Sequence, residues 1–323
     1  MGDLEAWGQV ASRYTIHQET LTYFRRLKGL GFKRAEEQTP EELRAFSLRR
    51  SELFGGHVDF CGSEIEYFAS SLNSQIRVPV TVYKSFDVSQ VPAILVFFHG
   101  GGLVSSSRCA YATTFKKLAK CARCLVVGVE YRLAPEDRVP AAFHDCRCAT
   151  EWILGNKELV GGHPDSKVGI GGDSAGGQLT ASVAHDVQGL AFQIAIYPFT
   201  DLTLSAPSYS EFVDTPGLNT NTIKWFMKQF LENEDQVTDP VVSPYFRPSF
   251  IGLPPALVIL AELDPIRDDG LAYAKKMQEA GVPTDILVVH GAPHVFFHLP
   301  GHFKELCREP YEKIVEFVQR FQT

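Results

Sequence analysis

The spacing of apolar residues divides the chain into a helical beginning and a longer stretch in which strands and helices alternate. Apolar positions recur on one helical face over residues 10–29 and again over 40–54. Residues 76–82 alternate between apolar and other side chains, which predicts a strand. Short continuous apolar runs then follow, each typical of a strand that is buried on both faces: 93–98, 124–129, 168–170, 192–196, 256–260 and 286–289.

Stretches of helical length separate these runs. They lie at 108–120, 140–156, 175–188, 268–280 and 304–322. Such alternation predicts an α/β fold with a mostly parallel central sheet and helices on both faces. The order breaks once, over residues 201–250, where no strand is evident. A predicted helix at 221–232 carries more apolar residues than a lone solvent-exposed helix should show, so we expect it to pack as a lid against the N-terminal helices.

The helix expected over 40–54 has clear signals at both ends. Thr39 can accept a hydrogen bond from the first turn, Pro40 suits the first helical position, and Glu42 can reach back to the cap. Gly55 is placed to end the helix.

Charge and composition exclude several functions and favour one location. The net charge is −7, from 38 acidic and 31 basic residues, which argues against a nucleic-acid partner. No apolar run is long enough for a membrane span, and the first residues lack the basic and then apolar order of a secretory signal. Seven cysteines cannot all pair within one chain and suit reduced thiols, so we expect a cytoplasmic protein. The C-x-x-C of Cys121 and Cys124 lies at the mouth of a predicted strand, and we expect no metal there.

The sharpest local signal is Gly172-Asp173-Ser174-Ala175-Gly176, between a predicted strand and a predicted helix. This pattern is the Gly-x-Ser-x-Gly nucleophile elbow in the strand–turn–helix context that it requires. Small residues two positions either side of the serine allow a tight turn, and the helix N-terminus favours developing negative charge. A serine at an ordinary helix N-cap is the alternative interpretation.

A second signal, His99-Gly100-Gly101-Gly102, follows the strand predicted at 93–98. Consecutive glycines expose backbone N–H groups, as an oxyanion hole requires. A flexible glycine turn would have the same sequence. However, the His-Gly-Gly-Gly motif occurs about seventy residues before the Gly-x-Ser-x-Gly motif, and this combination favours the catalytic interpretation.

A serine nucleophile needs a base and an orienting acid, each in a loop after a later strand. Asp264 lies in the loop after the strand predicted at 256–260, and Pro265 disfavours a helix there. Asp268 and Asp269 come later and suit the cap of the next helix, while Glu262 fits the end of the strand.

For the base, His294 lies in the loop after the last predicted strand, whereas His290 is too close to the strand itself. His294, His298 and His302 recur at a spacing of four, which on one helix would resemble a metal site. Pro300 interrupts such a helix, so we expect neither a metal nor a cofactor.

The sequence resembles the hormone-sensitive-lipase family of α/β-hydrolase esterases, which includes arylacetamide-deacetylase-like and plant carboxylesterases. The resemblance runs from about residue 80 to the end. Besides the two glycine motifs above, it rests on Glu130-Tyr131-Arg132-Leu133-Ala134-Pro135-Glu136, Asp239-Pro240, Ser243-Pro244, Gly252-Leu253-Pro254-Pro255-Ala256, Asp264-Pro265-Ile266-Arg267-Asp268 and Ala280-Gly281-Val282-Pro283.

The resemblance implies an α/β-hydrolase fold with a helical cap. It implies cap helices in residues 1–56, a cap insertion at 201–250, and a catalytic core formed by 57–200 and 251–323. It also implies roles for individual residues: Ser174 as nucleophile, His294 as base, Asp264 as orienting acid, and the N–H groups of Gly101, Gly102 and Ala175 as oxyanion donors.

One position departs from the family. Its members usually read His-Gly-Phe at the base, and here the sequence is His294-Val295-Phe296. A valine at this position changes the backbone conformations that are allowed and narrows the space beside the base.

The expected activity is hydrolysis of small or medium acyl or aryl esters through an acyl-enzyme. Two alternatives stay open: an amide or lactone hydrolase, such as a deacetylase, with the same triad, and a ligand receptor on a hydrolase-like scaffold. The expected partner is a small-molecule ester, and an exposed edge strand near 286–289 could pair two chains into a homodimer. Five residues are candidates for an apolar pocket wall, with plain packing as the alternative: Leu103, Val104, Trp225, Phe226 and Phe230.

Overall fold

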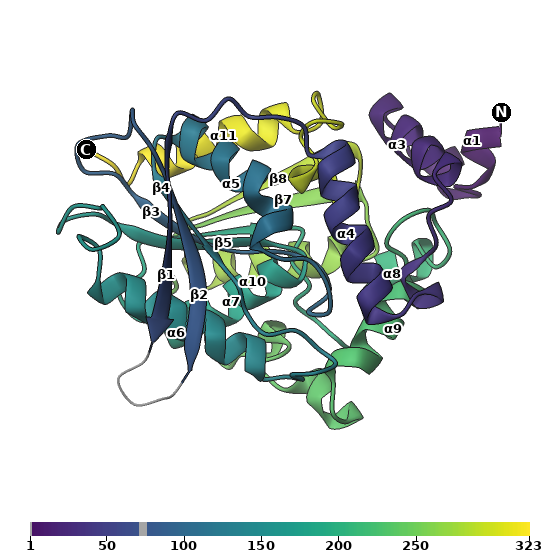
Figure 1. The fold of residues 1–323 in the computed structure, drawn as a ribbon. Helices are drawn as coiled ribbons and strands as arrows, with labels where there is room; N and C mark the ends of the chain where they lie inside the picture. The colour runs from purple at the N-terminus through teal and green to yellow at the C-terminus, as the bar shows by residue number, and fades with distance from the viewer. Residues whose placement is uncertain (1, 71–75) are drawn as a thin grey trace.

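The computed structural model describes residues 2–70 and 76–323. Within them, one eight-stranded sheet has the strand order β1-β2-β4-β3-β5-β6-β7-β8 (Figure 1). The strands are β1 Gly62–Ser70, β2 Arg77–Ser85, β3 Ile94–Phe98, β4 Leu125–Val129, β5 Val168–Asp173, β6 Phe192–Ile196, β7 Ala256–Leu263 and β8 Thr284–Pro293. β2 pairs antiparallel with β1 and β4, and all other pairs are parallel. The mostly parallel sheet is therefore confirmed.

Helices cover both faces of the sheet, as predicted. α5 and α11 lie on one face, and α6, α7 and α10 on the other (Figure 1). The helices are α1 Gly2–Glu5, α2 Val10–Arg13, α3 Gln18–Gly29, α4 Pro40–Phe54, α5 Arg108–Ala122, α6 Ala141–Gly155, α7 Ala175–Asp186, α8 Pro207–Glu211, α9 Thr220–Phe230, α10 Arg267–Glu279 and α11 Arg308–Gln319. Short 3-10 helices occur at Ala35–Glu37, Glu234–Thr238, Pro244–Phe246 and Phe296–His298. No helix in these described ranges is long and apolar enough to cross a bilayer.

Two apolar cores, one on each face, explain why the central strands are continuously apolar. In β3, Ile94, Val96 and Phe98 belong to one core, while Leu95 and Phe97 belong to the other. Successive side chains of a strand point to opposite faces, so most positions of a strand between two helical layers are apolar, and the buried Gln193 of β6 is an exception that donates to the Pro254 carbonyl at 3.0 Å.

One N-terminal prediction needs correction, and one is confirmed. The helix expected over 10–29 is two helices, because the chain bends after Arg13 and the His17 side chain caps α3 by accepting from the Glu19 N–H at 3.2 Å. The His17 N–H donates to the Gly291 carbonyl of β8, which fixes this bend. α4 begins as predicted, with the Thr39 hydroxyl and the Glu42 carboxylate completing a capping box.

β1 is a strand that the sequence pattern did not reveal. It lies at the edge of the sheet, and its Ile65 and Phe68 side chains are 47% and 54% exposed. Without a consistently buried face, an edge strand does not show the alternation on which strand prediction depends.

The N-terminal helices gather with α8 and α9 at one end of the sheet (Figure 1). There α9 packs against the 3-10 helix Ala35–Glu37, and α3 contacts β8. This arrangement agrees with a lid formed by the two segments, although the domain limits themselves stay a prediction.

Candidate active site

Ser174 occupies a sharp turn between β5 and α7. Its backbone has φ 56° and ψ −121°, a conformation that costs energy for a residue with a side chain. The Ser174 N–H donates to the Ile196 carbonyl at 2.9 Å, which ties the turn to β6. Two residues later, a Cβ atom on Gly176 would lie 2.0 Å from the Phe98 carbonyl oxygen, so only glycine fits this approach of helix to strand. The local geometry thus accounts for the Gly-x-Ser-x-Gly spacing.

A continuous line of hydrogen bonds joins Ser174, His294 and Asp264. Ser174 Oγ lies 2.8 Å from His294 Nε2, and His294 Nδ1 lies 2.6 Å from Asp264 Oδ2. Asp264 is fully buried, and its other oxygen accepts the Ile266 N–H at 3.1 Å. With the ring proton on Nδ1, the imidazole donates to the carboxylate and Nε2 accepts from the serine. The three side chains follow β5, β8 and β7, whose carboxyl ends meet at one edge of the sheet.

The other acids near this edge have different partners. Glu262 lies within β7, as expected, and holds His290 Nδ1 at 2.6 Å and the Gly291 N–H at 2.7 Å. Asp268 lies in the first turn of α10, pairs with Arg267 at 2.8 Å and accepts the Ser208 N–H at 3.0 Å. Asp264 is therefore the acid that the structure brings to His294.

The glycine loop after β3 presents unused donors to the same place. Within the described residues, the N–H groups of Gly101, Gly102 and Ala175 have no hydrogen-bond acceptor, and all three residues line one cavity with Ser174. The loop is held from behind: the Tyr131 hydroxyl donates to the His99 carbonyl at 2.6 Å, and the Gly100 N–H donates to Asp173 at 3.0 Å. Fixed, unpaired donors of this kind suit an oxyanion.

Asp173 connects the loop to the elbow and is buried with no salt bridge in the described residues. Burial raises the pKa of Asp173 to about 6, although hydrogen bonds from Tyr111 at 2.8 Å and Tyr197 at 3.2 Å favour its charged form. It is a structural carboxylate beneath the site, since it contacts the loop and not His294.

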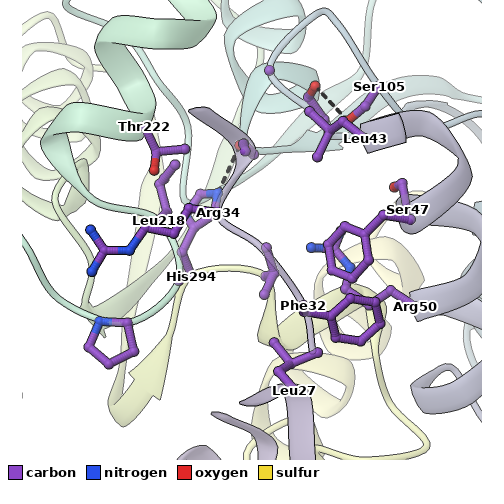
Figure 2. Close-up of a pocket in the computed structure, with 18 of the residues that line it drawn as sticks. Leu27, Phe32, Arg34, Leu43, Ser47, Arg50, Ser105, Leu218, Thr222 and His294 are labelled. Atoms are coloured by element: carbon purple, nitrogen blue, oxygen red, sulfur yellow. Dashed lines mark hydrogen bonds between the residues drawn. The ribbon is translucent and has the colours of Figure 1, made fainter. Parts of the chain in front are cut away.

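A cavity of about 720 Å³ opens above these groups, between the sheet edge and the N-terminal helices (Figure 2). Of the five apolar residues predicted for its wall, Phe226 and Phe230 line it. Leu103 and Val104 are buried in the core instead, because the glycine loop turns inward at Leu103, whose φ is 60°. Trp225 packs edge-on against Phe226, with ring centroids 5.2 Å apart, and is not part of the wall.

The wall on the α4 side contains polar residues that sequence reasoning missed. Leu43, Ser47 and Arg50 are spaced by four and three residues, so they share one face of α4, and Figure 2 shows them on one side of the cavity with Leu218 and Thr222 on another. The only sequence signal was that a serine and an arginine interrupt the apolar face of this helix.

Val295 also lines the cavity, next to His294. Its φ is 74°, in the left-handed region that a β-branched residue rarely adopts. The position where the family usually has glycine thus keeps the backbone that glycine favours, while the valine side chain takes up space beside the base.

The histidine row does not form a metal site. His298 stacks on Tyr111, and His302 contacts the Glu19 carbonyl at 2.9 Å. Among the described residues, no group of three or more His, Cys, Asp or Glu side chains is placed to hold a metal ion.

Comparison with known proteins places the chain in a family. A model of the α/β-hydrolase fold family matches residues 95–298. The carboxylesterase NlhH of Mycobacterium tuberculosis is 36% identical over 226 residues, which cover 66% of this chain and 70% of that protein. An ethyl acetate hydrolase of Pseudomonas putida is 32% identical over 251 residues, covering 75% and 78%.

Solved structures agree with the sequence relatives. A thermostable esterase from Pseudomonas putida superposes with a TM-score of 0.87 at 26% identity and covers 95% of this chain and 98% of that one. An ester hydrolase from the Lake Arreo metagenome also gives 0.87, at 28% identity with coverage of 95% and 99%. The fold and these relatives show that the chain belongs to the α/β-hydrolase fold family, among its hormone-sensitive-lipase-like esterases.

Proposed function

We propose that the chain hydrolyses carboxylic esters, with Ser174 as nucleophile, His294 as base and Asp264 as orienting acid. The observation that carries this proposal is the unbroken hydrogen-bonded line from the Ser174 hydroxyl through His294 to the buried Asp264. Membership of an esterase family and the strained turn at Ser174 support it.

The reaction has two acyl-transfer steps. His294 Nε2 takes the Ser174 proton as Oγ attacks the ester carbonyl, and Asp264 stabilises the imidazolium and its orientation. The negative oxygen of the tetrahedral intermediate accepts hydrogen bonds from the N–H groups of Gly101, Gly102 and Ala175. His294 returns the proton to the departing alcohol, and a water activated by His294 then releases the acid from the acyl-enzyme.

The substrate class follows from the size and lining of the cavity. A volume of about 720 Å³ suits a small or medium ester, and Phe226 and Phe230 offer apolar surface to an acyl or aryl group. A small-molecule ester partner and a cytoplasmic location belong to this proposal.

A series of 4-nitrophenyl esters of increasing acyl length tests the proposal, with wild type and Ser174→Ala compared under the same conditions. We expect turnover by the wild type and a loss of about 10⁴-fold or more in the variant, with unchanged melting temperature. Turnover retained by the pure variant would show that Ser174 is not the nucleophile.

The same series separates the alternatives. An amide or lactone hydrolase would cleave matched anilides or lactones with higher kcat/KM than the esters. A receptor on this scaffold would give no turnover in any series, and its ligands would be found by a rise in melting temperature.

A further inference from the structure

Arg50 is a half-buried cation whose side chain contacts neutral groups, namely His298, Phe46 and Tyr23. Its Nη2 lies 3.4 Å from His298 Nε2, and its guanidinium lies over the Phe46 ring at 5.4 Å and faces the Tyr23 hydroxyl. Burial lowers the pKa of His298 well below its ordinary value and raises the pKa of Tyr23, so neither carries charge near neutral pH. In the described part of the chain, no carboxylate lies within ion-pair distance of Arg50.

Hydrogen-bonding capacity at this wall is also unused. Arg50 Nε and Ser47 Oγ are both buried, and neither has a hydrogen-bond partner among the described residues. The Ser47 side chain is only 2% exposed, and it lies one helical turn from Arg50 on the same face of α4. Buried donors without partners are costly, so a pair of them lining one cavity indicates a ligand group that would satisfy both.

Other basic residues line the same cavity. Among the described residues, the cavity is lined by the bases Lys28, Lys33, Arg34 and Arg50 and by the acids Glu5, Asp173 and Asp214, while Arg25 also lines it but has an interaction of its own. Of the acids, Asp214 pairs with Arg34 and Asp173 bonds Tyr111 and the glycine loop. Lys28 and Lys33, for which no ion pair is found among the described residues, favour the approach of an anion.

We propose that Arg50 and Ser47 form a subsite for a carboxylate, and that the substrate is an ester that carries a second, negatively charged acid group. This inference rests on the proposed function, because the ester carbonyl must reach Ser174 while the carboxylate contacts α4. A guanidinium and a hydroxyl donate together to the oxygens of a carboxylate, and such charge-assisted hydrogen bonds are stronger than neutral ones. Monoesters of dicarboxylic acids, and acyl esters of hydroxy acids, have the required chemistry.

Two matched pairs of esters test the inference and show on which side of the ester the charge lies. The first pair is 4-nitrophenyl hydrogen suberate and its methyl ester, in which the carboxylate is on the acyl side. The second is 4-butyryloxybenzoate and its methyl ester, with the carboxylate on the alcohol side. In at least one pair, we expect wild-type kcat/KM to be about 10-fold or more higher for the anion than for the neutral partner.

Arg50→Met should lower that anion-to-neutral ratio by about 10- to 100-fold, and Arg50→Lys should retain much of it because it keeps the charge. Ser47→Ala should lower the ratio by a smaller factor. Arg49→Met is the matched control, since Arg49 is the exposed neighbour on α4 and does not line the cavity, and the ratio should stay as in wild type.

A purely structural role for Arg50 would reduce both esters of a pair equally and leave the ratio unchanged. That result, or a wild type that prefers the neutral ester in both pairs, would overturn the inference.

Binding of suberate to Ser174→Ala, measured by calorimetry, separates this inference from the proposed function. We expect Arg50→Met to weaken that binding by about 10-fold or more and Arg49→Met to leave it unchanged. If Arg50→Met weakens suberate binding and Arg49→Met does not, but the wild type hydrolyses no ester, the subsite would be supported and the proposed esterase function contradicted. Equal binding of suberate by both variants would contradict the subsite.

Discussion

The loops at the carboxyl edge of the sheet and the inner face of α4 border the same cavity but are built in different ways. In the loops, backbone geometry sets the site: Ser174 has an uncommon φ, and Gly176 has no room for a Cβ atom. On α4, side chains of ordinary helical residues, Ser47 and Arg50, set the properties of the wall. A site that is fixed by the backbone restricts which residue types can occupy it, so it can be recognised from the sequence. A wall that is formed by ordinary side chains carries no such restriction and cannot be recognised in this way.

The largest effect on the rate should come from replacing Asp264, the acid in the loops at the sheet edge. Asp264→Asn should lower kcat by about 10⁴-fold, because the amide cannot hold the required imidazole tautomer. Asp268→Asn is the matched control on α10, where the loss of its contacts with Arg267 and Ser208 should reduce stability by about 1 kcal/mol with little effect on rate. Ester kinetics and urea unfolding of both variants check this, and a larger rate loss in Asp268→Asn would show that the acid is misassigned.

Gly102 is where the glycine loop meets α9. A Cβ atom at this residue would lie 2.3 Å from a ring carbon of Phe226, and its φ is 64°. Gly102→Ala should therefore displace an oxyanion donor and lower kcat by about 100-fold. Gly155→Ala, where a Cβ atom meets nothing within 4 Å, is the control and should be neutral.

A double variant sharpens the test at Gly102. Phe226→Ala removes the clashing ring, so adding it to Gly102→Ala should restore part of the rate. Strictly additive losses would mean that the contact between loop and lid does not position the donor.

The raised pKa of Asp173 predicts that the stability of the protein depends on pH. Its pKa is about 6 in the folded protein against an ordinary value of 3.8, so the folded state retains a proton that the unfolded chain releases. The free energy of unfolding should therefore fall as pH rises from about 4 to 6, by about 3 kcal/mol for the 2.2-unit difference.

Urea unfolding at a series of pH values checks this expectation. The stability of wild type minus that of Asp173→Asn should fall by about that amount between pH 4 and 7. A flat difference would show that the pKa of Asp173 is the same in the folded and unfolded states.

The smallest effect is expected at Val295. Val295→Gly removes the cost of a left-handed valine but adds chain entropy to the unfolded state, so the net gain should be about 1 kcal/mol, or about 2 °C in Tm. Val288→Gly in β8, where φ is not positive, should lower Tm instead. A lower Tm in Val295→Gly would mean that valine packing against the cavity outweighs the strain.

Much of the fold was predictable because burial on both faces leaves its mark on the sequence. The inner strands β3 to β7 lie between two apolar cores, and their continuous apolar runs located them. β1 was missed because Ile65 and Phe68 are exposed at an edge. The bend between α2 and α3 was missed because the contact that fixes it, from His17 to Gly291, joins residues far apart in the chain.

Some residues of the site were also predictable from the sequence, and others were not. The positions of Ser174, Asp264 and His294 followed from their places after strands, and the structure brings their side chains together. Leu103 and Val104 were placed on the pocket wall because they follow the glycines, but a local turn directs them into the core. Arg50 could not be recognised as a cavity residue from the sequence, because an arginine on a helix is usually exposed and only the structure shows what surrounds it.

The most direct test of Ser174 as the nucleophile is reaction of the intact protein with a fluorophosphonate, followed by mass spectrometry of the peptides. We expect one covalent adduct, on Ser174, that forms in step with the loss of ester turnover. Turnover that persists without an adduct, or an adduct on another residue that accompanies its loss, would contradict the account.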